Sequence, residues 1–309
     1  MKFFFLNSRA ALNFALQSKK YKYLSKSILL PDYICEEMID FFLKKSFKIS
    51  FYKIKKNLEP DLFSLKKKKT ENISFLLFVH FFGYPQNIDK FKSFSKKRNL
   101  ILIEDNAHGY GGLYNGKELG NSCEFGISSP HKTIKGLYSG GVLYGKFKKQ
   151  DLKKYNPNIF VKLKRLIKIM FPSILIIKKI LNPFINFEVR TYESLKIDDY
   201  SFKKLNRINL NKLRLIKKDY FQDLSKILEK NNIRIVHKNY DSQLNPWFLI
   251  VERSKKYEKK LLNISKENNF ELISWPAKFK KNGYEKLNSI KKEFYFIDLS
   301  FRYDGNRSN

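Results

Sequence analysis

The sequence predicts an α/β protein whose large domain is built on a mainly parallel sheet. Two continuous apolar runs, residues 74–79 and 100–103, each end in polar residues, and apolar residues at helical spacing lie between them, after Pro85 and Asn87. Continuous apolar runs that alternate with helices are typical of parallel strands buried on both faces. Ligands bind beyond the carboxyl ends of such strands, so Asp105 is expected at a ligand site, or it serves only as a strand-end residue or helix cap.

The residues ahead of these runs predict further strands and a first helix. Asn7 and Ser8 can cap a helix that begins near Arg9, because both side chains can accept a hydrogen bond from a first-turn amide. Short strands are expected at residues 2–6, 27–30 and 48–52.

Residues 158–184 are basic and apolar in alternation, with Pro172 as a helix breaker. Such a helical segment can pack against the large domain, form a dimer contact, or lie on an anionic membrane surface. The first two interpretations are favoured together over the third, which stays open.

The C-terminal third predicts a small α+β domain introduced by one long helix over residues 201–229. We place the large domain at residues 1–195 and the small domain, with its leading helix, at residues 196–309. Trp247 and Trp275 are interpreted first as packing residues and second as residues of a substrate cleft. Strands are expected at residues 233–236, 247–251 and 272–275, with a helix between Lys255 and Asn268.

The composition indicates a folded chain with a strong positive charge. Its 309 residues are 43% hydrophobic, and 62 basic against 29 acidic residues give a net charge of +33. Such a charge usually indicates a nucleic-acid or acidic membrane partner, but the lysines are scattered and no nucleic-acid motif accompanies them, so no specific nucleic acid is expected. Positive potential also favours a nucleotide-sugar diphosphate.

Two cysteines, Cys35 and Cys123, provide neither a disulfide framework nor a metal-ligand cluster. A reducing, cytoplasmic setting is therefore expected. Asn7 and Arg9 interrupt the first apolar run, so no signal peptide is expected. The sequence contains no run of about 18 uncharged apolar residues, so no transmembrane helix is expected.

Four motifs in a fixed order give the most specific signal. They are His80-x-x-Gly83, Glu104-Asp105-x-Ala107-His108-x-x-Gly111, Ser129-x-x-Lys132 and Gly140-Gly141. This pattern resembles the DegT/DnrJ/EryC/StrS family of sugar aminotransferases, which have the fold of type I pyridoxal-phosphate (PLP) enzymes. The resemblance implies a mainly parallel seven-stranded sheet with helices on both faces, a small α+β C-terminal domain, and a homodimer whose active sites draw residues from both subunits.

The resemblance assigns roles to the motif residues. Lys132 would form the Schiff base with PLP, and Asp105 would face the pyridine nitrogen. His108 would lie against the ring or near its phenolic oxygen, and Ser129 would hydrogen-bond the phosphate. The glycines beyond Lys132 would let the backbone pass close to the cofactor.

Other positions depart from the family pattern. Ser8 stands where a glycine is usual, and phosphate contact by Ser8 or Arg9 is the weaker alternative to helix capping. Cys35 stands where an aromatic ring usually covers PLP, and Tyr33 would substitute for it or be a buried structural residue. Some relatives carry a histidine in place of the lysine and dehydrate sugars, so Lys132 favours transamination.

The resemblance therefore implies a PLP-dependent aminotransferase that transfers an amino group, often from glutamate, to a nucleotide-linked keto-sugar for polysaccharide or glycan synthesis. The alternative is a catalytically inactive or diverged member of the fold that acts as a binding or scaffold protein. The substitutions at Ser8 and Cys35 and an atypical C-terminal segment motivate that alternative.

Overall fold

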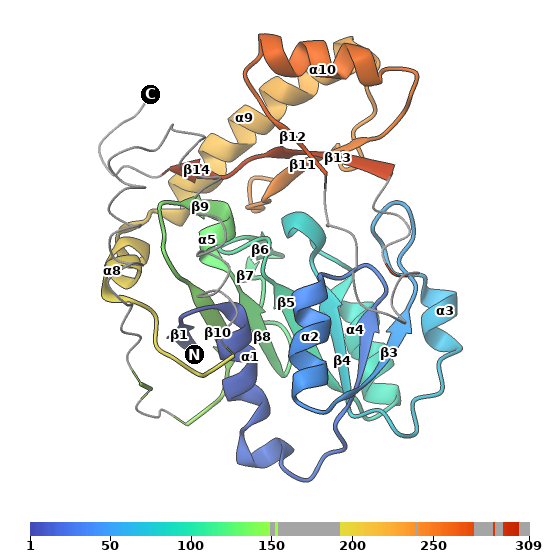
Figure 1. The fold of residues 1–309 in the computed structure, drawn as a ribbon, viewed down its shortest axis with the longest axis vertical. Coiled ribbons are helices and arrows are strands. Elements are labelled where there is room, and N and C mark those ends of the chain that lie inside the picture. The colour runs from blue at the N-terminus through green and yellow to red at the C-terminus, as the bar shows by residue number, and fades with distance from the viewer. Residues whose placement is uncertain (149–151, 154–191, 239, 275–286, 288–292, 303–309) are drawn as a thin grey trace.

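The computed structural model describes residues 1–148, 152–153, 192–238, 240–274, 287 and 293–302. A large sheet-centred domain lies below a smaller domain in the view of Figure 1. The basic apolar segment 158–184 and Trp275 lie outside the described residues, so the predictions made for them remain predictions. Among the helices that the structure describes, none is long and apolar enough to cross a bilayer.

The large domain contains a seven-stranded sheet in the order β1-β10-β8-β5-β4-β2-β3. Strands β8, β5, β4, β2 and β3 pair in parallel, whereas β10 is antiparallel to both β8 and β1. The predicted fold class, with its mainly parallel sheet, is confirmed. The strands are β1 Lys2–Phe5, β2 Ser27–Pro31, β3 Lys48–Tyr52, β4 Phe75–Val79, β5 Ile101–Asn106, β8 Phe125–Ser128 and β10 Gly141–Gly145.

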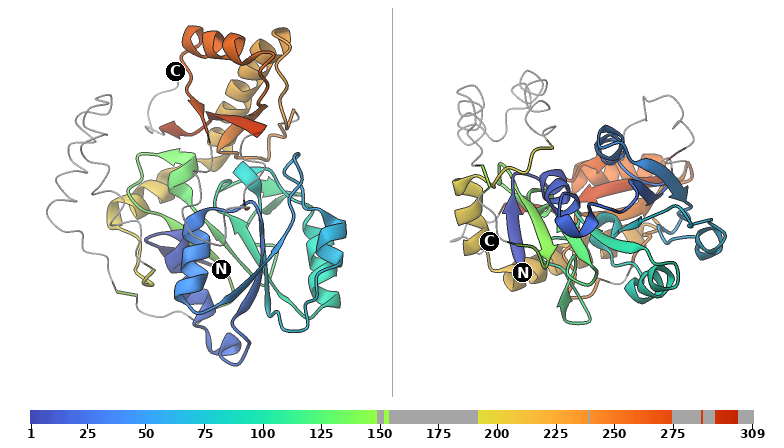
Figure 2. Two further views of the ribbon diagram at one scale, coloured as in Figure 1. Left: turned by 45° about the vertical axis from the view of Figure 1, so that its right-hand side comes forward. Right: turned by 90° about the horizontal axis from the view of Figure 1, so that it is seen from below.

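Helices cover both faces of this sheet. Figure 2 shows α1 and α2 on one side and α4 on the other. Every residue of β2 and β4 is buried, because these central strands have helices on both faces. The helices of this domain are α1 Ser8–Leu16, η1 Lys19–Tyr21, α2 Glu36–Lys44, α3 Leu62–Lys66, η2 Phe81–Gly83, α4 Ile88–Lys97 and α5 Pro130–Thr133.

Asparagine caps set two of these helix starts. The side chain of Asn7 accepts a hydrogen bond from the Ala10 amide at 2.9 Å, and that of Asn87 accepts one from the Lys90 amide at 3.0 Å. Each side chain satisfies an amide that the first turn leaves without a helical partner. The predicted cap of the first helix is therefore Asn7, and Ser8 is its first helical residue.

The small domain has a three-stranded antiparallel sheet in the order β11-β13-β12, packed with α9 and α10. The strand predicted at residues 233–236 does not form, because Ile235 makes only an isolated bridge to Val251. Two short pairings complete the described structure: β6 with β7, and β9 in parallel with β14. The remaining elements are β6 Leu113–Tyr114, β7 Lys117–Glu118, β9 Ile134–Lys135, α8 Asp199–Arg207, α9 Leu210–Lys230, β11 Phe248–Glu252, α10 Glu258–Glu267, β12 Leu272–Ile273, β13 Phe294–Asp298 and β14 Phe301–Arg302.

The prediction of a single long helix over residues 201–229 is wrong, because the helix is interrupted at Ile208. Ile208 is extended (φ −79°, ψ 124°), and the side chain of Asn209 accepts a hydrogen bond from the Lys212 amide at 3.0 Å. The asparagine starts a new helix, α9, instead of continuing α8. Helix α8 contacts the large domain, where Ser201 Oγ accepts a hydrogen bond from the Tyr138 amide.

Candidate active site at the carboxyl edge of the sheet

One pocket brings together the side chains to which the sequence assigned catalytic or cofactor-binding roles. It has a volume of about 180 Å³ and lies where β4, β5 and β8 end and helices α1, α2 and α5 begin. Cys35, His131 and Glu37 also line it. The predicted residues that line the pocket are Ser8, Arg9, Tyr33, Asp105, His108, Ser129 and Lys132.

Asp105 and Lys132 affect each other's ionisation across this pocket. Asp105 is 4% exposed at the end of β5, and its Oδ1 accepts a hydrogen bond from the Ala107 amide at 2.8 Å. Burial raises the pKa of Asp105, an effect opposed by that amide and by the charge of Lys132. Burial lowers the pKa of Lys132, an effect opposed by Cys35 and Asp105. The amine and the carboxylate therefore face the same cavity.

His108 is held as a neutral ring with a defined tautomer. Its Nδ1 accepts a hydrogen bond from the Phe82 amide at 3.1 Å, so the ring proton belongs to Nε2. Burial and the nearby charge of Lys132 hold the pKa of His108 well below its ordinary value. The ring stacks on Phe82 with centroids 5.3 Å apart and an interplanar angle of 14°. Sequence reasoning missed Phe82 in this role.

Phe82 adopts a left-handed conformation with φ +58° and ψ 15°. This conformation is unfavourable for a bulky residue and persists only where surrounding contacts fix it. Phe82 is completely buried, and its carbonyl accepts a hydrogen bond from the Trp247 amide at 2.8 Å. The residue that supports His108 is thereby fixed by a contact with the small domain.

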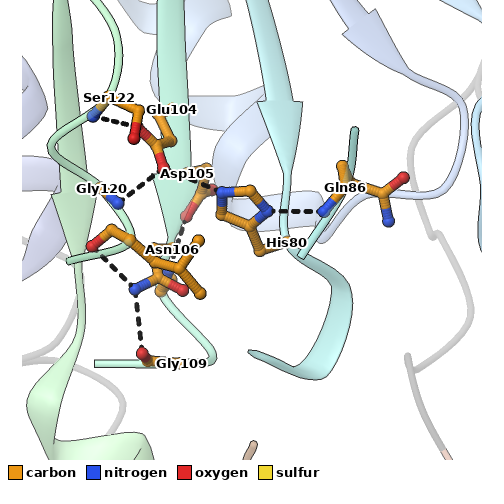
Figure 3. Close-up of polar contacts among 10 residues, drawn as sticks. His80, Gln86, Glu104, Asp105, Asn106, Gly109, Gly120 and Ser122 are labelled. Carbon is orange, nitrogen blue, oxygen red and sulfur yellow. Dashed lines mark hydrogen bonds and ion pairs between the residues drawn. The ribbon is translucent and has the colours of Figure 1, made fainter. Parts of the chain in front are cut away.

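His80 and Glu104 do not line the pocket but brace the strands that form it (Figure 3). His80 Nδ1 accepts from the Gln86 amide at 2.9 Å, and Nε2 donates to Glu104 Oε1 at 2.9 Å. Glu104 also accepts from the amides of Gly120 and Ser122, each at 2.7 Å. Burial alone would raise the pKa of Glu104, but these hydrogen bonds hold it below its ordinary value.

The His-x-x-Gly glycine makes room for the small domain. Gly83 has φ +93°, and a Cβ there would lie 2.6 Å from Pro246 Cα and 2.8 Å from the His108 carbonyl oxygen. A Cβ atom cannot approach backbone so closely. A glycine at this position therefore lets the segment before β11 reach the edge of the pocket.

The glycine pair after Lys132 packs against the start of α1 and against Pro130. A Cβ on Gly141 would lie 2.1 Å from the backbone of Asn7, and one on Gly140 would contact Pro130. Neither glycine is among the described residues that line the pocket. Gly141 thus brings β10 against Asn7 and Ser8, which line the pocket, and the predicted closeness of these glycines to a cofactor stays a prediction.

The start of α1 gives one end of the pocket the features of an anion-binding site. Ser8 and Arg9 form its first turn, and both line the cavity together with the buried Ser129. First-turn amides and the positive end of the helix dipole favour a phosphate group. Because Asn7 supplies the cap, the capping role considered for Ser8 is not needed.

Tyr33 and Cys35 lie just before α2 and form part of the pocket wall. The Tyr33 ring packs on Phe81 at 5.4 Å between centroids, and burial raises the pKa of its hydroxyl. Burial, with the charge of Glu37, raises the pKa of the Cys35 thiol to about 11, although Lys132 opposes the shift. Cys35 is therefore a neutral thiol near neutral pH, in the place where an aromatic ring was expected.

Comparison with known proteins identifies a family for part of the chain. Residues 44–146 match the DegT/DnrJ/EryC1/StrS aminotransferase family, which confirms the predicted resemblance over that segment. The chain is 32% identical over 101 residues to UDP-4-amino-4,6-dideoxy-N-acetyl-beta-L-altrosamine transaminase of Campylobacter jejuni, covering 31% of this chain and 27% of that protein. It is 34% identical over 56 residues to GDP-perosamine synthase of Escherichia coli O157:H7, covering 18% and 15%. The aligned part thus spans about a quarter or less of these relatives.

Solved structures share the fold over almost the whole chain. Helicobacter pylori PseC, an aminotransferase involved in the biosynthesis of pseudaminic acid, superimposes with a TM-score of 0.65 at 14% identity, covering 96% of this chain and 81% of that one. E. coli GDP-4-keto-6-deoxy-D-mannose-3-dehydratase with bound hydrated PLP gives a TM-score of 0.61 at 16% identity, covering 98% and 84%. At these identities the likeness concerns the fold, and it agrees with the type I fold predicted from the sequence.

Proposed function

We propose that this chain is a PLP-dependent aminotransferase that transfers an amino group to a nucleotide-linked keto-sugar. The observation that carries the proposal is the joint placement of Lys132 and Asp105 in one pocket, each within reach of the other's charge. The match of residues 44–146 to an aminotransferase family supports it, because that segment contains both residues. Nucleotide-sugar transaminases among the relatives support the substrate class.

The donor set of the pocket fits PLP. A half-buried lysine amine, a buried carboxylate and a helix start with an arginine would match the aldehyde, the ring nitrogen and the phosphate of that cofactor. Bound PLP supplies an electron sink for the carbon that exchanges its amino group. Lys132 would provide the amine for the aldehyde, and the Asp105 carboxylate would hold a proton on the ring nitrogen.

The remaining residues of the pocket would position the cofactor and the substrate. The neutral His108 would offer its Nε2 proton to an oxygen on the ring or on the substrate. Ser8, Arg9 and Ser129 would hold the phosphate. His131 Nδ1 donates to the Gly140 carbonyl at 3.1 Å, so the base next to Lys132 is anchored to the backbone. Lys132 occupies the motif position, so Lys132 and not His131 would supply the reactive group.

The setting of the reaction follows from the same proposal. The chain would work as a cytoplasmic homodimer, with an amino acid such as glutamate as donor and a product used in surface polysaccharide or glycan synthesis. Its positive charge would attract the diphosphate of the nucleotide-sugar. No specific nucleic-acid partner is included in this proposal.

The test is the colour of the protein with PLP. Wild-type protein should become yellow with PLP, and the Lys132→Ala variant should lose the visible band and at least about a thousandfold of the amino-transfer rate. The measurement is the absorption spectrum together with turnover of a nucleotide-linked keto-sugar. Lys135→Ala, a change in an exposed lysine on the same segment, is the control and should stay yellow. A colourless wild-type protein would instead favour a binding or scaffold role.

A further inference from the structure

Trp247 belongs to the small domain but is bonded to both domains. Its amide donates to the Phe82 carbonyl, and its carbonyl accepts from the Leu299 amide, each at 2.8 Å. Residue 246, just before it, is the one that Gly83 admits next to the pocket. The backbone of Trp247 is therefore fixed at the junction between the domains.

The indole of Trp247 extends from this junction to the reactive amine. Lys132 Nζ lies over the indole ring, 5.1 Å from its centroid. The indole also contacts His108, with ring centroids 5.2 Å apart and an interplanar angle of 56°. An ammonium over an indole face is attracted by the negative potential of the ring, and the attraction grows when water is excluded. Lys132 thus has an aromatic neighbour that does not come from its own domain.

A buried lysine supports this arrangement from behind. Lys217, on α9, is completely buried, and its Nζ donates to the Pro246 carbonyl at 3.1 Å. Burial lowers the pKa of Lys217 to about 7, while Asp298 opposes that shift. A buried amine without partners would be costly, so this hydrogen bond has a structural purpose. It fixes the residue that immediately precedes Trp247.

We propose that Trp247 is a positioning residue that holds the amine of Lys132 on its indole face, and that Lys217 braces the segment carrying the indole. The catalytic meaning of this contact rests on the proposed function, whereas the contact itself does not. The indole favours the ammonium form of Lys132 and keeps the amine inside the pocket whenever it is not bonded to a cofactor. Docking of the small domain is thereby coupled to the state of the lysine.

The test measures the ionisation of Lys132 in protein without PLP. Brief acylation with acetic anhydride at a series of pH values, followed by peptide mass spectrometry, gives an apparent pKa for Lys132. Replacing the indole by Trp247→Leu should lower that pKa by about half to one unit, because one side of the ammonium loses its aromatic partner. Trp247→Phe should recover part of the shift. The other groups that act on Lys132 stay in place: Cys35, Asp105, Arg9 and Glu37.

Lys217→Met tests the brace. It should shift the Lys132 profile in the same direction as Trp247→Leu, but by less, because the indole is loosened and not removed. Lys212→Met, an exposed change on the same helix, should leave the profile unchanged. Circular dichroism confirms that each variant is folded, and the acylation of exposed Lys212 provides an internal reference in the Trp247 variants.

An unchanged Lys132 profile in folded Trp247→Leu protein would overturn the proposal, as would a Trp247→Phe variant that shifts as much as Trp247→Leu. An equal shift in the Lys217→Met and Lys212→Met variants would show that Lys217 does not hold the segment that carries Trp247. These outcomes are separate from the proposed function, because no cofactor is present. If the wild-type protein stays colourless with PLP but the Lys132 profile still shifts in Trp247→Leu, the enzyme assignment is wrong and the contact between Trp247 and Lys132 is retained.

Discussion

The half of the pocket built on β4, β5 and β8 differs in construction from the half supplied by the starts of α1 and α2. The strand half carries Asp105, His108 and Lys132, and buried polar contacts such as His80–Glu104 fix it from behind. The helix half offers first-turn amides and the side chains of Ser8 and Cys35. Backbone amides serve a phosphate whatever side chain they carry. The strand half therefore acts through its side chains, whereas the helix half acts through backbone amides. Side-chain substitutions should be better tolerated in the helix half.

The largest expected effect is on activity, in the strand half. Asp105→Asn should lower the amino-transfer rate by roughly a hundredfold to ten-thousandfold, because an amide cannot hold a proton on the ring nitrogen as a carboxylate does. Stability should not fall. The folded-state pKa of Asp105 is raised by burial, so the ionised carboxylate costs stability as pH rises through that pKa, and the amide removes this cost.

Turnover assays and urea unfolding measure the two effects, with Asp61→Asn, at the N-cap of α3, as the control for loss of a carboxylate. An Asp105→Asn variant that keeps full activity would break the distinction between the two halves.

The next carboxylate along the chain should behave in the opposite way. Glu104→Gln should lower the free energy of unfolding by about 2–4 kcal/mol, because an amide nitrogen would face amides that now donate to the carboxylate. The folded-state pKa of Glu104 is lowered, so its contribution is present above the ordinary pKa of glutamate and is lost as pH falls through the folded pKa. The gap between wild type and variant should therefore close in acid.

Urea titrations from neutral pH down into that acid range check this, with the exposed Glu59→Gln as the control. A gap that is constant across pH would show that Glu104 does not contribute through its charge.

A glycine substitution tests the junction that carries Trp247. Gly83→Ala should cost roughly 2–4 kcal/mol of stability, because its Cβ would lie 2.6 Å from Pro246 Cα and its φ is +93°. The matched control is Gly116→Ala, which has φ +73° but nothing within 4 Å of its Cβ, and it should cost about 1 kcal/mol. Equal losses in the two variants, measured by thermal or urea unfolding, would leave only backbone strain as the cause.

The smallest expected effect is in the helix half. Arg9→Met should weaken PLP binding by about tenfold through loss of a charged donor, since the backbone amides of α1 remain. Ser8→Ala should change it less. Spectroscopic titration with PLP measures both, and Arg98→Met, an exposed change on the surface, is the control. A thousandfold loss in Arg9→Met would mean that side chains dominate in this half too.

The parts of the fold that the sequence predicted are those with strong local signals. Apolar runs identified the buried strands, and asparagine caps located the starts of α1 and α4. The motif order placed Asp105 and Lys132 in one pocket. The break at Ile208 also had a local signal, the cap at Asn209, but helical periodicity continues across it and conceals it.

Other features depend on contacts between distant segments, which periodicity does not contain. The left-handed Phe82 exists only because the small domain and His108 bond its backbone. The approach of Trp247 to Lys132 depends on how two domains dock. Residues 233–236 have the composition of a strand, yet they join the outer edge of β11 through a single bridge, from Ile235 to Val251.

The parallel pairing of β14 with β9 has a mechanical consequence. Strand β9 begins two residues after Lys132, and β14 follows the last strand of the small-domain sheet, β13, after two residues. Lys132 therefore lies on a short segment between the two domains, with Ser129 and Pro130 before it and the pairing of residues 134–135 with residues 301–302 after it. A displacement of the small domain would therefore act on the backbone two residues from Lys132.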